Sequence, residues 1–199
     1  MTLEVDELGC VRGGRDIFTG ISFSLQPGQL LAVTGPNGAG KSSLLRILAG
    51  LLRPASGRIS LTPDGEELSP MHYFGHLDGL KDAMSLRENL AFWGLLYSGR
   101  ANMEAVAEAA DRFGLGHALD LPVAVFSAGQ RRRAGLARLT LSPRPLWLLD
   151  EPTSALDRQG EGALGTLMSE HLGAGGTIVA ATHLTLPVAA DLTLEMAPE

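Results

Sequence analysis

Apolar residues recur along the chain in two rhythms, one typical of strands and the other of helices. Residues 3–8 and 21–25 alternate apolar and polar positions, as strands with one exposed face do. Three later runs of strand length are apolar almost throughout: residues 29–34, 146–149 and 177–182. Strands that are buried on both faces of a parallel sheet have this composition. The pattern predicts a parallel sheet that is joined to an antiparallel part.

Shorter segments complete the expected order of elements. Further strands are expected over residues 57–61, 71–75 and 191–196, and a turn at Pro63-Asp64-Gly65. Helices are expected at residues 41–50, 85–116, 127–141 and 157–172. The helical stretch at residue 85 opens with a capping box formed by Ser85 and Glu88. The first helix should bury an apolar face made of Leu44, Leu45, Ile47, Leu48 and Leu51.

The helix-rich stretch divides the chain. We expect a single domain over residues 1–199, in which residues 1–75 and 143–199 form the core with its β subdomain. Residues 77–142 form an inserted helical subdomain. Within it, Leu86, Trp93 and Tyr97 follow one another at helical spacing. They serve either in core packing or as a docking surface.

A Gly-rich loop lies between the strand ending at Thr34 and the helix that follows. Its sequence is Gly35-Pro36-Asn37-Gly38-Ala39-Gly40-Lys41-Ser42, with Ser43 next. Strand, glycine-rich loop and helix in this order form a phosphate-binding loop. Backbone N–H groups and the N-terminus of the helix then hold phosphates, Lys41 adds positive charge, and the Ser42 hydroxyl binds Mg²⁺. This predicts an α/β P-loop NTPase that binds a nucleoside triphosphate with Mg²⁺.

Two other apolar strands end at residues that carry chemistry. Asp150 and Glu151 follow one strand and His183 follows another. In open parallel sheets, ligands bind beyond the carboxyl ends of the strands. Asp150 is expected to hold Mg²⁺, Glu151 to polarise the attacking water and His183 to contact the γ-phosphate. Taken singly, the Asp-Glu pair also suits a helix cap, and the histidine a structural role.

Ser127-Ala128-Gly129-Gln130 opens a helix and allows two interpretations. Ser127 and Gln130 form a Ser-x-x-Gln capping box. A helix N-terminus is also an anion site, and Gly129 leaves room for a phosphate to approach. Both interpretations can hold together.

Composition and charge narrow the class of protein. The chain has 199 residues, of which 45% are hydrophobic, and a formal net charge of -6. The acidic balance argues against nucleic acid as the main partner. The one cysteine, Cys10, excludes an internal disulfide and is expected to be buried. We expect no signal peptide and no membrane-spanning segment, so that any membrane span would come from another chain.

These motifs together resemble the ATP-binding cassette family. The resemblance rests on the loop at residues 35–42, the segments 127–130 and 146–151, the segment Ser154-Ala155-Leu156-Asp157, and His183. In the same order, the family names for these segments are the phosphate loop, the signature, the strand that ends in the Mg²⁺ ligand and the general base, the D-loop with Asp157, and the switch histidine. The resemblance implies a head-to-tail homodimer, in which Ser127 and Gly129 of one protomer face the γ-phosphate bound by the other.

Two positions depart from the family pattern. His76 stands where the family carries the glutamine of the Q-loop, and Arg12 stands where an aromatic ring meets adenine. A guanidinium plane can stack on a base, so Arg12 remains the expected adenine contact. In the family, this glutamine contacts Mg²⁺ and water and couples the ATPase to its membrane partner. The replacement by His76 leaves it open whether these roles carry over to this chain.

The departures resemble one subgroup, the ATP-binding subunit of the cytochrome c biogenesis (haem exporter) transporter. The resemblance is carried by residues 10–13, 73–81, 86–93 and 145–152. It implies an integral membrane partner, further cytochrome c maturation proteins, and a peripheral position on the cytoplasmic face of the bacterial inner membrane. It also implies that ATP hydrolysis serves haem handling or the release of a haem chaperone. His72, His117 and His171 are expected to be surface or helix-end residues.

Three alternatives stay open at this point. The chain could be the ATPase subunit of another ABC importer or exporter, because the family core would be identical. It could also be a soluble cassette ATPase acting on nucleic acid or ribosomes, although its acidity and lack of large insertions count against this. A phosphate-loop kinase would leave residues 127–130 unexplained.

Overall fold

The computed structural model describes residues 1–62 and 71–197. The chain forms two compact units. The first comprises Met1–Gly75, Arg144–Pro152 and Leu167–Glu199, and the second comprises His76–Pro143 and Thr153–Thr166. The turn expected at Pro63-Asp64-Gly65 lies outside the described residues.

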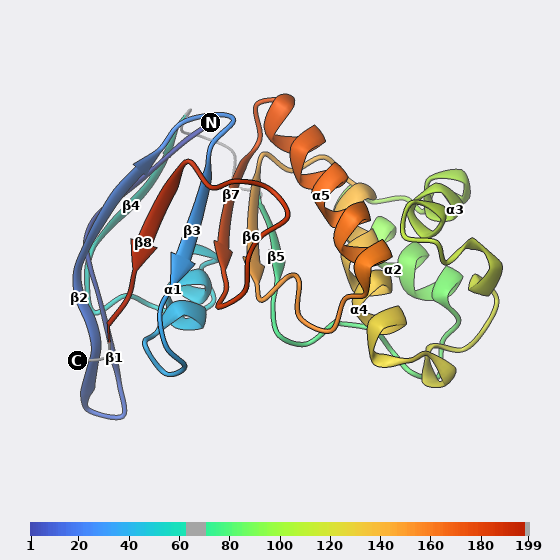
Figure 1. The fold of residues 1–199 in the computed structure, drawn as a ribbon, viewed down its shortest axis with the longest axis horizontal. Helices are drawn as coiled ribbons and strands as arrows, with labels where there is room; N and C mark the ends of the chain where they lie inside the picture. Colours follow the sequence, from blue (N-terminus) through green and yellow to red (C-terminus); the bar gives the residue numbers. More distant parts are fainter. Residues whose placement is uncertain (63–70, 198–199) are drawn as a thin grey trace. The chain divides into compact units, whose positions relative to one another are not determined.

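The first unit contains an antiparallel sheet in the order β2-β1-β4 (Figure 1). Its strands are β1 (Thr2–Arg12), β2 (Arg15–Leu25) and β4 (Ser56–Thr62). Leu3 and Val5 on β1 pair with Leu25 and Phe23 on β2. Leu3 and Val5 are buried, whereas Glu4 between them is exposed. The alternation of apolar and polar residues therefore places one face of this sheet in the core, as the sequence predicts.

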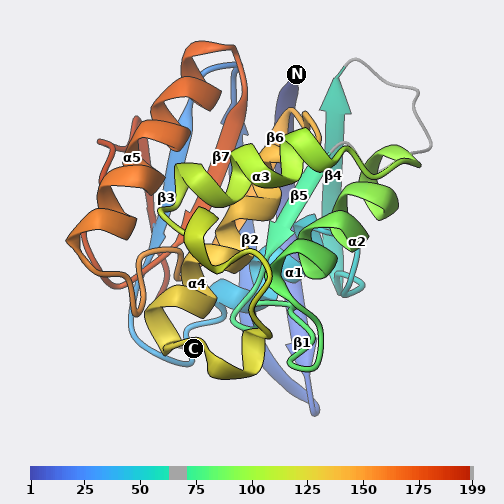
Figure 2. The ribbon, with the colours of Figure 1, turned by 90° about the vertical axis from the view of Figure 1, so that its right-hand side faces the viewer.

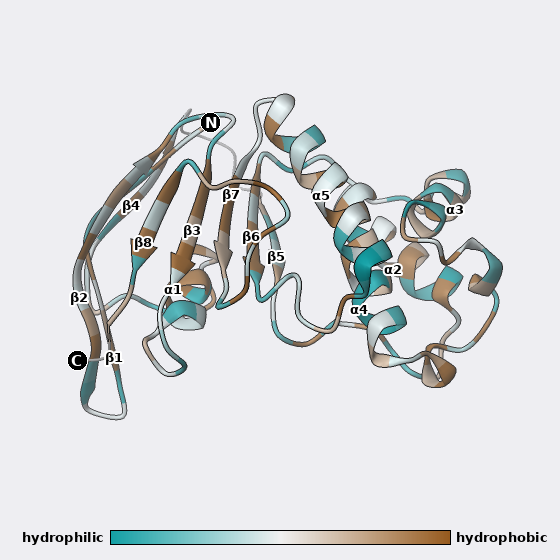
Figure 3. Cartoon of the chain, viewed as in Figure 1, coloured by the Kyte–Doolittle hydropathy of each residue, from teal (hydrophilic) through white to brown (hydrophobic). Residues whose placement is uncertain are grey.

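The same unit contains a five-stranded sheet in the order β5-β6-β7-β3-β8 (Figure 1). Its strands are β3 (Leu30–Thr34), β5 (Met71–Phe74), β6 (Leu146–Asp150), β7 (Thr177–Ala181) and β8 (Leu192–Glu195). All neighbouring strands are parallel. Every residue of β6 and β7 is buried, and β3 and β6 are largely hydrophobic in Figure 3. The three central strands are therefore the buried parallel strands that the apolar runs predict, whereas the outer strands β5 and β8 are only partly buried or exposed.

One hydrophobic core joins both sheets of the first unit to helix α1 (Lys41–Leu48). Leu8 of β1, Val33 of β3 and Leu44 of α1 all belong to it and are buried completely. Cys10 is buried in the same core, as expected. The core therefore fixes α1 against the sheet at the point where the Gly-rich loop ends.

The second unit is helical, and Figure 2 shows its helices α2, α3 and α4. Its main elements are α2 (Leu86–Ser98), α3 (Met103–Arg112), η1 (Gly116–Ala118), η2 (Val123–Val125), α4 (Ala128–Ala137) and η3 (Arg138–Thr140). Helix α5 (Arg158–Gly173) contributes to both units. Ser85 and Glu88 form the expected capping box at the start of α2. Among the described residues, no helix combines the length and apolarity that crossing a membrane requires.

The three residues of α2 that could serve core packing or docking, Leu86, Trp93 and Tyr97, differ in burial. Leu86 is fully buried, which confirms core packing at that position. Trp93 and Tyr97 are only half-buried, and their rings lie 5.3 Å apart. The Arg138 guanidinium lies 4.4 Å from the centre of the Trp93 ring. A cation held over an indole face is stabilised by the ring quadrupole, so Trp93 serves packing inside this unit.

The prediction that Leu51 shares the buried face of α1 is wrong. α1 ends at Leu48, and Leu51 is 65% exposed. Gly50 adopts a left-handed φ of 70°, and the N–H of Leu51 donates to the carbonyl of Arg46 at 2.8 Å. This hydrogen bond and the left-handed glycine form a Schellman C-cap, which turns the chain away from the helix axis.

His72 was expected at the surface, and this prediction is also wrong. Its exposed fraction is 1% because it points to the same face of β5 as the buried Phe74. The His72 ring meets Trp147 of β6 edge-on at 6.4 Å, and Trp147 stacks on His171 of α5 at 3.9 Å. His171 lies in the last turn of its helix and His117 is exposed in η1, in agreement with the expectation for both.

The buried stacking of His171 predicts a loss of stability in acid. Burial lowers the pKa of His171 below its ordinary value of 6.5, and hydrogen bonds with the backbone of Thr177 and Pro145 partly offset this. Below about pH 6.5 the unfolded chain therefore binds more protons at this residue than the folded chain. The free energy of unfolding should fall as the pH drops through this range.

Urea denaturation at pH 7.5 and 5.5 measures this effect. His171→Phe keeps a ring on Trp147 but cannot titrate, so its free energy of unfolding should decline less between the two pH values than that of the parent. His117→Phe, at an exposed histidine, should leave the pH dependence of the parent unchanged. An equal decline in the parent and in His171→Phe would contradict the assignment.

Candidate functional site

The Gly-rich loop connects β3 to α1 in a conformation that requires glycine. Gly35, Gly38 and Gly40 have φ values of 131°, 89° and 97°, which side chains with a Cβ rarely adopt. Gly40 is the N-cap of α1, and none of the side chains that the structure describes caps this helix. The first backbone N–H groups of the helix therefore have no intrahelical acceptor and are available to an anion.

Lys41 lies over this loop. Its side chain is buried, and its Nζ donates to the carbonyl of Gly35 at 2.7 Å and to that of Pro36 at 3.0 Å. These two hydrogen bonds hold the ammonium group beside the loop backbone, so positive charge is concentrated where the N–H groups gather.

Parallel pairing brings three chemically important strand ends to one edge of the sheet. β6, β7 and β3 are consecutive neighbours in the sheet order. Asp150 ends β6, His183 follows β7 after one residue, and the Gly-rich loop follows β3. The convergence of the three strand ends that the sequence predicts is therefore present in the first unit.

A hydrogen bond links two of these ends. The hydroxyl of Ser42 donates to Oδ1 of Asp150 at 3.1 Å, and Asp150 is 2% exposed. The described residues contain no group of three or more His, Cys, Asp or Glu side chains that could hold a metal. A hydroxyl next to one carboxylate fits Mg²⁺, which proteins bind through one or two side chains while phosphate and water oxygens complete the octahedron.

Glu151 and His183 form a pair. Oε1 of Glu151 lies 2.8 Å from Nδ1 of His183, and the carboxylate is less exposed than the ring, 17% against 54%. The sequence assigned these residues separate roles and did not predict their contact. A proton on Nδ1 that is shared with the carboxylate leaves Nε2 of the histidine for a ligand. Glu151 also has a left-handed φ of 49°, a strained conformation of the kind found at functional sites.

Arg12 lies at the tip of the β1–β2 hairpin. It pairs with Arg15 across the turn made by Gly13 and Gly14, and its side chain is exposed. The residue expected to meet adenine is therefore accessible, on a strand of the first unit.

Ser127–Gln130 belong to the second unit, where the capping-box interpretation is correct. The N–H of Ser127 donates to Oε1 of Gln130 at 2.9 Å, and the N–H of Gln130 donates to Oγ of Ser127 at 3.2 Å. Gly129 has a packing role that the sequence did not reveal, because a Cβ there would lie 3.1 Å from the carbonyl oxygen of Ala155. Ala128, like Ser127, is exposed.

Two predicted residues of the second unit, His76 and Ala128, line a pocket of about 300 Å³, whereas Asp157 is not part of its lining. The residues that line it are His76, Leu77, Asp78, Ala128, Arg131, Arg132, Ser154 and Ala155. His76 is exposed, and its carbonyl accepts a hydrogen bond from Arg132 at 3.2 Å. Asp157 accepts from the N–H of Gly160 at 2.8 Å and lies 3.8 Å from the guanidinium of Arg133.

Sequence reasoning missed the arginines that follow Gln130. Arg131 and Arg132 both contact the segment that follows β5, through Asp78 and the carbonyl of His76, whereas Arg133 contacts Asp157. Arg132 and Arg133 are buried, which is uncommon for a charged side chain without partners. The available signal was the run of three positive charges directly after the capped turn.

Comparisons with known proteins agree with this geometry. The family model described as ABC transporter matches residues 18–154. A cytochrome c biogenesis ATP-binding export protein CcmA from Rhodopseudomonas palustris (strain BisB5) is 53% identical over 187 residues, which cover 92% of both chains. A protein of the same name from Nitrobacter winogradskyi is 51% identical, with 96% of both chains covered.

Solved structures confirm the fold class. A putative ABC transporter ATP-binding protein from Pyrococcus furiosus matches with a TM-score of 0.86 and 21% identity, over 98% of both chains. An ATP-binding subunit of an ABC transporter matches with the same TM-score and 26% identity, over 98% of this chain and 86% of the other. The predicted α/β P-loop fold, with its antiparallel β part and inserted helices, is correct.

The loop geometry predicts that two glycines respond differently to the same substitution. In Gly35→Ala the new Cβ would overlap the carbonyl oxygen of Met196, whereas in Gly38→Ala it meets nothing within 4 Å. Both variants carry the strain of a positive φ, about 1–2 kcal/mol, and Gly35→Ala adds a steric overlap of about 1–3 kcal/mol. Chemical denaturation should find Gly35→Ala the less stable of the two, and equal stabilities would contradict the close approach to Met196.

Proposed function

Because the chain belongs to the ABC transporter family and to its cytochrome c biogenesis ATP-binding export proteins, we propose that it hydrolyses ATP as the energy subunit of such a transporter. One observation carries the ATPase part of this proposal. Lys41, Ser42, Asp150, Glu151 and His183 all lie at the edge where β3, β6 and β7 end. The relatives carry the cytochrome c part.

The Gly-rich loop is proposed to hold the triphosphate. Its backbone N–H groups and the first turn of α1 donate to phosphate oxygens, and Lys41 neutralises charge on the β- and γ-phosphates. The residues assigned to this role are Gly35, Pro36, Asn37, Gly38, Ala39, Gly40, Lys41, Ser42 and Ser43. Arg12 is proposed to stack on the adenine through its guanidinium plane.

Ser42 and Asp150 are proposed to hold Mg²⁺. Their hydrogen-bonded oxygens provide the small set of hard ligands that this ion accepts alongside phosphate and water. When bound, the ion would neutralise charge that develops on the β- and γ-phosphates. Asp150 is buried, so its carboxylate is held in place for this contact.

Glu151 is proposed to activate the attacking water. Its carboxylate would orient the water and accept its proton as the oxygen approaches the γ-phosphorus. His183 holds the carboxylate through Nδ1 and can contact a γ-phosphate oxygen through Nε2. His183 would therefore connect the general base, Glu151, to the γ-phosphate that the water attacks.

We assign Ser127, Ala128, Gly129 and Gln130 to a second copy of the site. In a head-to-tail homodimer, Ser127 and Gly129 of one protomer would face the γ-phosphate held by the other, and Asp157 would lie at the same interface. The exposed capped turn at Ser127 supports this assignment, because a helix N-terminus favours anions. His76 takes the place of the Q-loop glutamine.

The partner is proposed to be an integral membrane subunit similar to CcmB, together with further cytochrome c maturation proteins. The chain would bind peripherally at the cytoplasmic face of the inner membrane, where its ATP hydrolysis drives haem handling. The names of the relatives, which describe cytochrome c biogenesis and export, support this assignment.

Replacing the proposed base tests the ATPase assignment. Glu151→Gln keeps the shape of the side chain but cannot accept a proton, so we expect turnover to fall about 10²–10⁴-fold. ATP should remain bound, and the variant should accumulate as an ATP-containing dimer. Steady-state phosphate release and size-exclusion chromatography with light scattering measure the two effects.

Two controls accompany this variant. Glu161→Gln, at an exposed glutamate of α5, should hydrolyse ATP normally. Removing Mg²⁺ with EDTA should abolish turnover by the parent. Normal hydrolysis by Glu151→Gln would exclude the proposed role of Glu151.

Isolation in mild detergent tests the choice of transporter. A tagged chain expressed in its own bacterium should retain an integral membrane protein encoded with the cytochrome c maturation genes. Cells that express the tag alone provide the control. Recovery of a membrane subunit from another transport system, or ATP hydrolysis stimulated by ribosomes or DNA, would overturn the proposal in favour of the corresponding alternative.

A further inference from the structure

The first turn of α4 is not held by apolar packing. Ser127 and Ala128 are exposed, Gly129 and Gln130 are half-buried, and burial begins only at Arg132. Apolar side chains bury area without fixing direction, whereas hydrogen bonds to charged groups fix both distance and angle. The buried Phe126 anchors the chain just before this turn, and the direction of the turn itself is set by the polar contacts of the residues that follow it.

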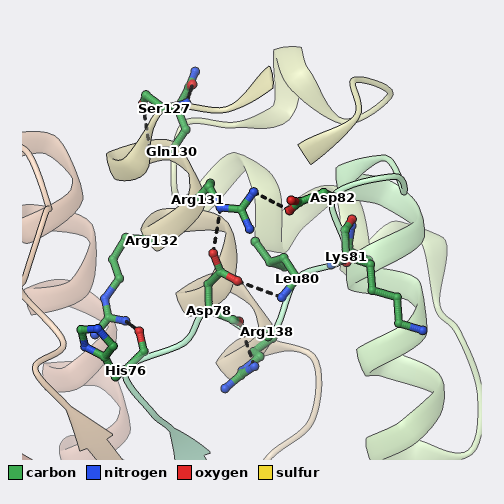
Figure 4. Close-up of polar contacts among 12 residues, drawn as sticks. His76, Asp78, Leu80, Lys81, Asp82, Ser127, Gln130, Arg131, Arg132 and Arg138 are labelled. Carbon is green, nitrogen blue, oxygen red and sulfur yellow. Dashed lines mark hydrogen bonds and ion pairs between the residues drawn. The ribbon is translucent and has the colours of Figure 1, made fainter. Parts of the chain in front are cut away.

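Arg131 makes the most direct of these contacts (Figure 4). Its Nε donates to Oδ2 of Asp78 at 3.0 Å, and a terminal guanidinium nitrogen donates to Oδ1 of Asp82 at 2.6 Å. The side chains of Arg131 and Asp78 are 27% and 21% exposed. A positive charge in the first turns of a helix is unfavourable to the helix dipole, and the two carboxylates compensate for it.

The segment that carries the two carboxylates is itself anchored. The carbonyl of His76 accepts from Arg132 at 3.2 Å, that of Asp78 from Arg138 at 3.1 Å, and that of Gly79 from the indole N–H of Trp93 at 3.2 Å. Oδ1 of Asp78 also accepts from the N–H of Leu80 at 3.0 Å. The Asp78 carboxylate is therefore fixed at both its backbone and its side chain before it meets Arg131.

We propose that Asp78 is a positioning residue for the turn Ser127–Gln130, and that it acts through Arg131. The fixed carboxylate sets the direction of the guanidinium, and this direction sets where the exposed residues Ser127 and Ala128 of the capped turn lie. Ser127–Gln130 would then reach the γ-phosphate of a second protomer only while the Asp78–Arg131 pair is intact. This inference rests on the proposed two-copy site.

The test separates nucleotide binding by one protomer from assembly of two. Asp78→Asn, Arg131→Gln and the double variant are made in the Glu151→Gln background, where ATP is retained. Fluorescent ATP-analogue titration of the dilute monomer measures binding at the Gly-rich loop. Analytical ultracentrifugation with MgATP measures the dimer dissociation constant.

Each single variant should leave monomer affinity and the melting temperature close to those of the parent, and should raise the dimer dissociation constant about tenfold, because small misplacements of a contact group have large effects. The double variant should be no worse than Arg131→Gln alone, because Arg131→Gln already removes the Asp78–Arg131 interaction, together with the contact to Asp82. Arg87→Gln is the matched control, since it breaks another arginine–aspartate pair of this unit, with Asp120 at 2.7 Å. It should change neither constant.

Two results would count against different parts of the argument. If the Glu151→Gln parent forms no dimer with MgATP, the proposed two-copy site fails. If the parent dimerises and the Asp78 and Arg131 variants dimerise equally well, the two-copy site stands and the positioning role is refuted. A fall in melting temperature and monomer affinity along with dimerisation would show that the pair is merely structural, which also refutes the proposal.

Discussion

Parallel pairing of β6, β7 and β3 is the constraint on which the candidate site depends. These strands are buried on both faces, so a shift in register would carry polar residues from the strand ends into the apolar interior of the sheet, where they would lose their hydration. The register holds Asp150 level with Ala181 and Leu149 level with Ala180. The packing of apolar strands, which take no part in the proposed reaction, therefore determines which polar residues meet at the edge of the sheet.

Much of the fold and part of the site can be predicted because the signals are local. Buried parallel strands are recognisable as short apolar runs, and the glycine positions of the loop reflect backbone conformations that other residues avoid. Capping boxes are equally local, and the boxes at Ser85 and Ser127 are both formed. The wrong predictions for Leu51 and His72 also have local causes. The helix ends before Leu51, at the left-handed Gly50, and His72 lies on the same face of its strand as the buried Phe74.

Contacts between distant segments could not be predicted in the same way. The pairing of Glu151 with His183 joins the ends of two strands, and the contact of Asp78 with Arg131 joins positions 53 residues apart. A single sequence shows that charged residues exist at these positions but not which of them meet. The close approach of Gly129 to Ala155 belongs to the same class, because it depends on how two backbones pack.

The hydrogen bonds of Lys41 have a consequence for ligand discrimination. Its ammonium group already donates to two backbone carbonyls, those of Gly35 and Pro36. Any ligand that recruits this lysine must therefore compete with neutral acceptors that are held within the same loop. An ionised oxygen adds to the hydrogen bond a Coulomb attraction between two full charges, which a neutral carbonyl does not provide. Replacing the two carbonyls by ligand oxygens therefore favours a polyanion over a neutral molecule of the same shape. The carbonyls of Gly35 and Pro36 thus help the loop to discriminate against uncharged ligands.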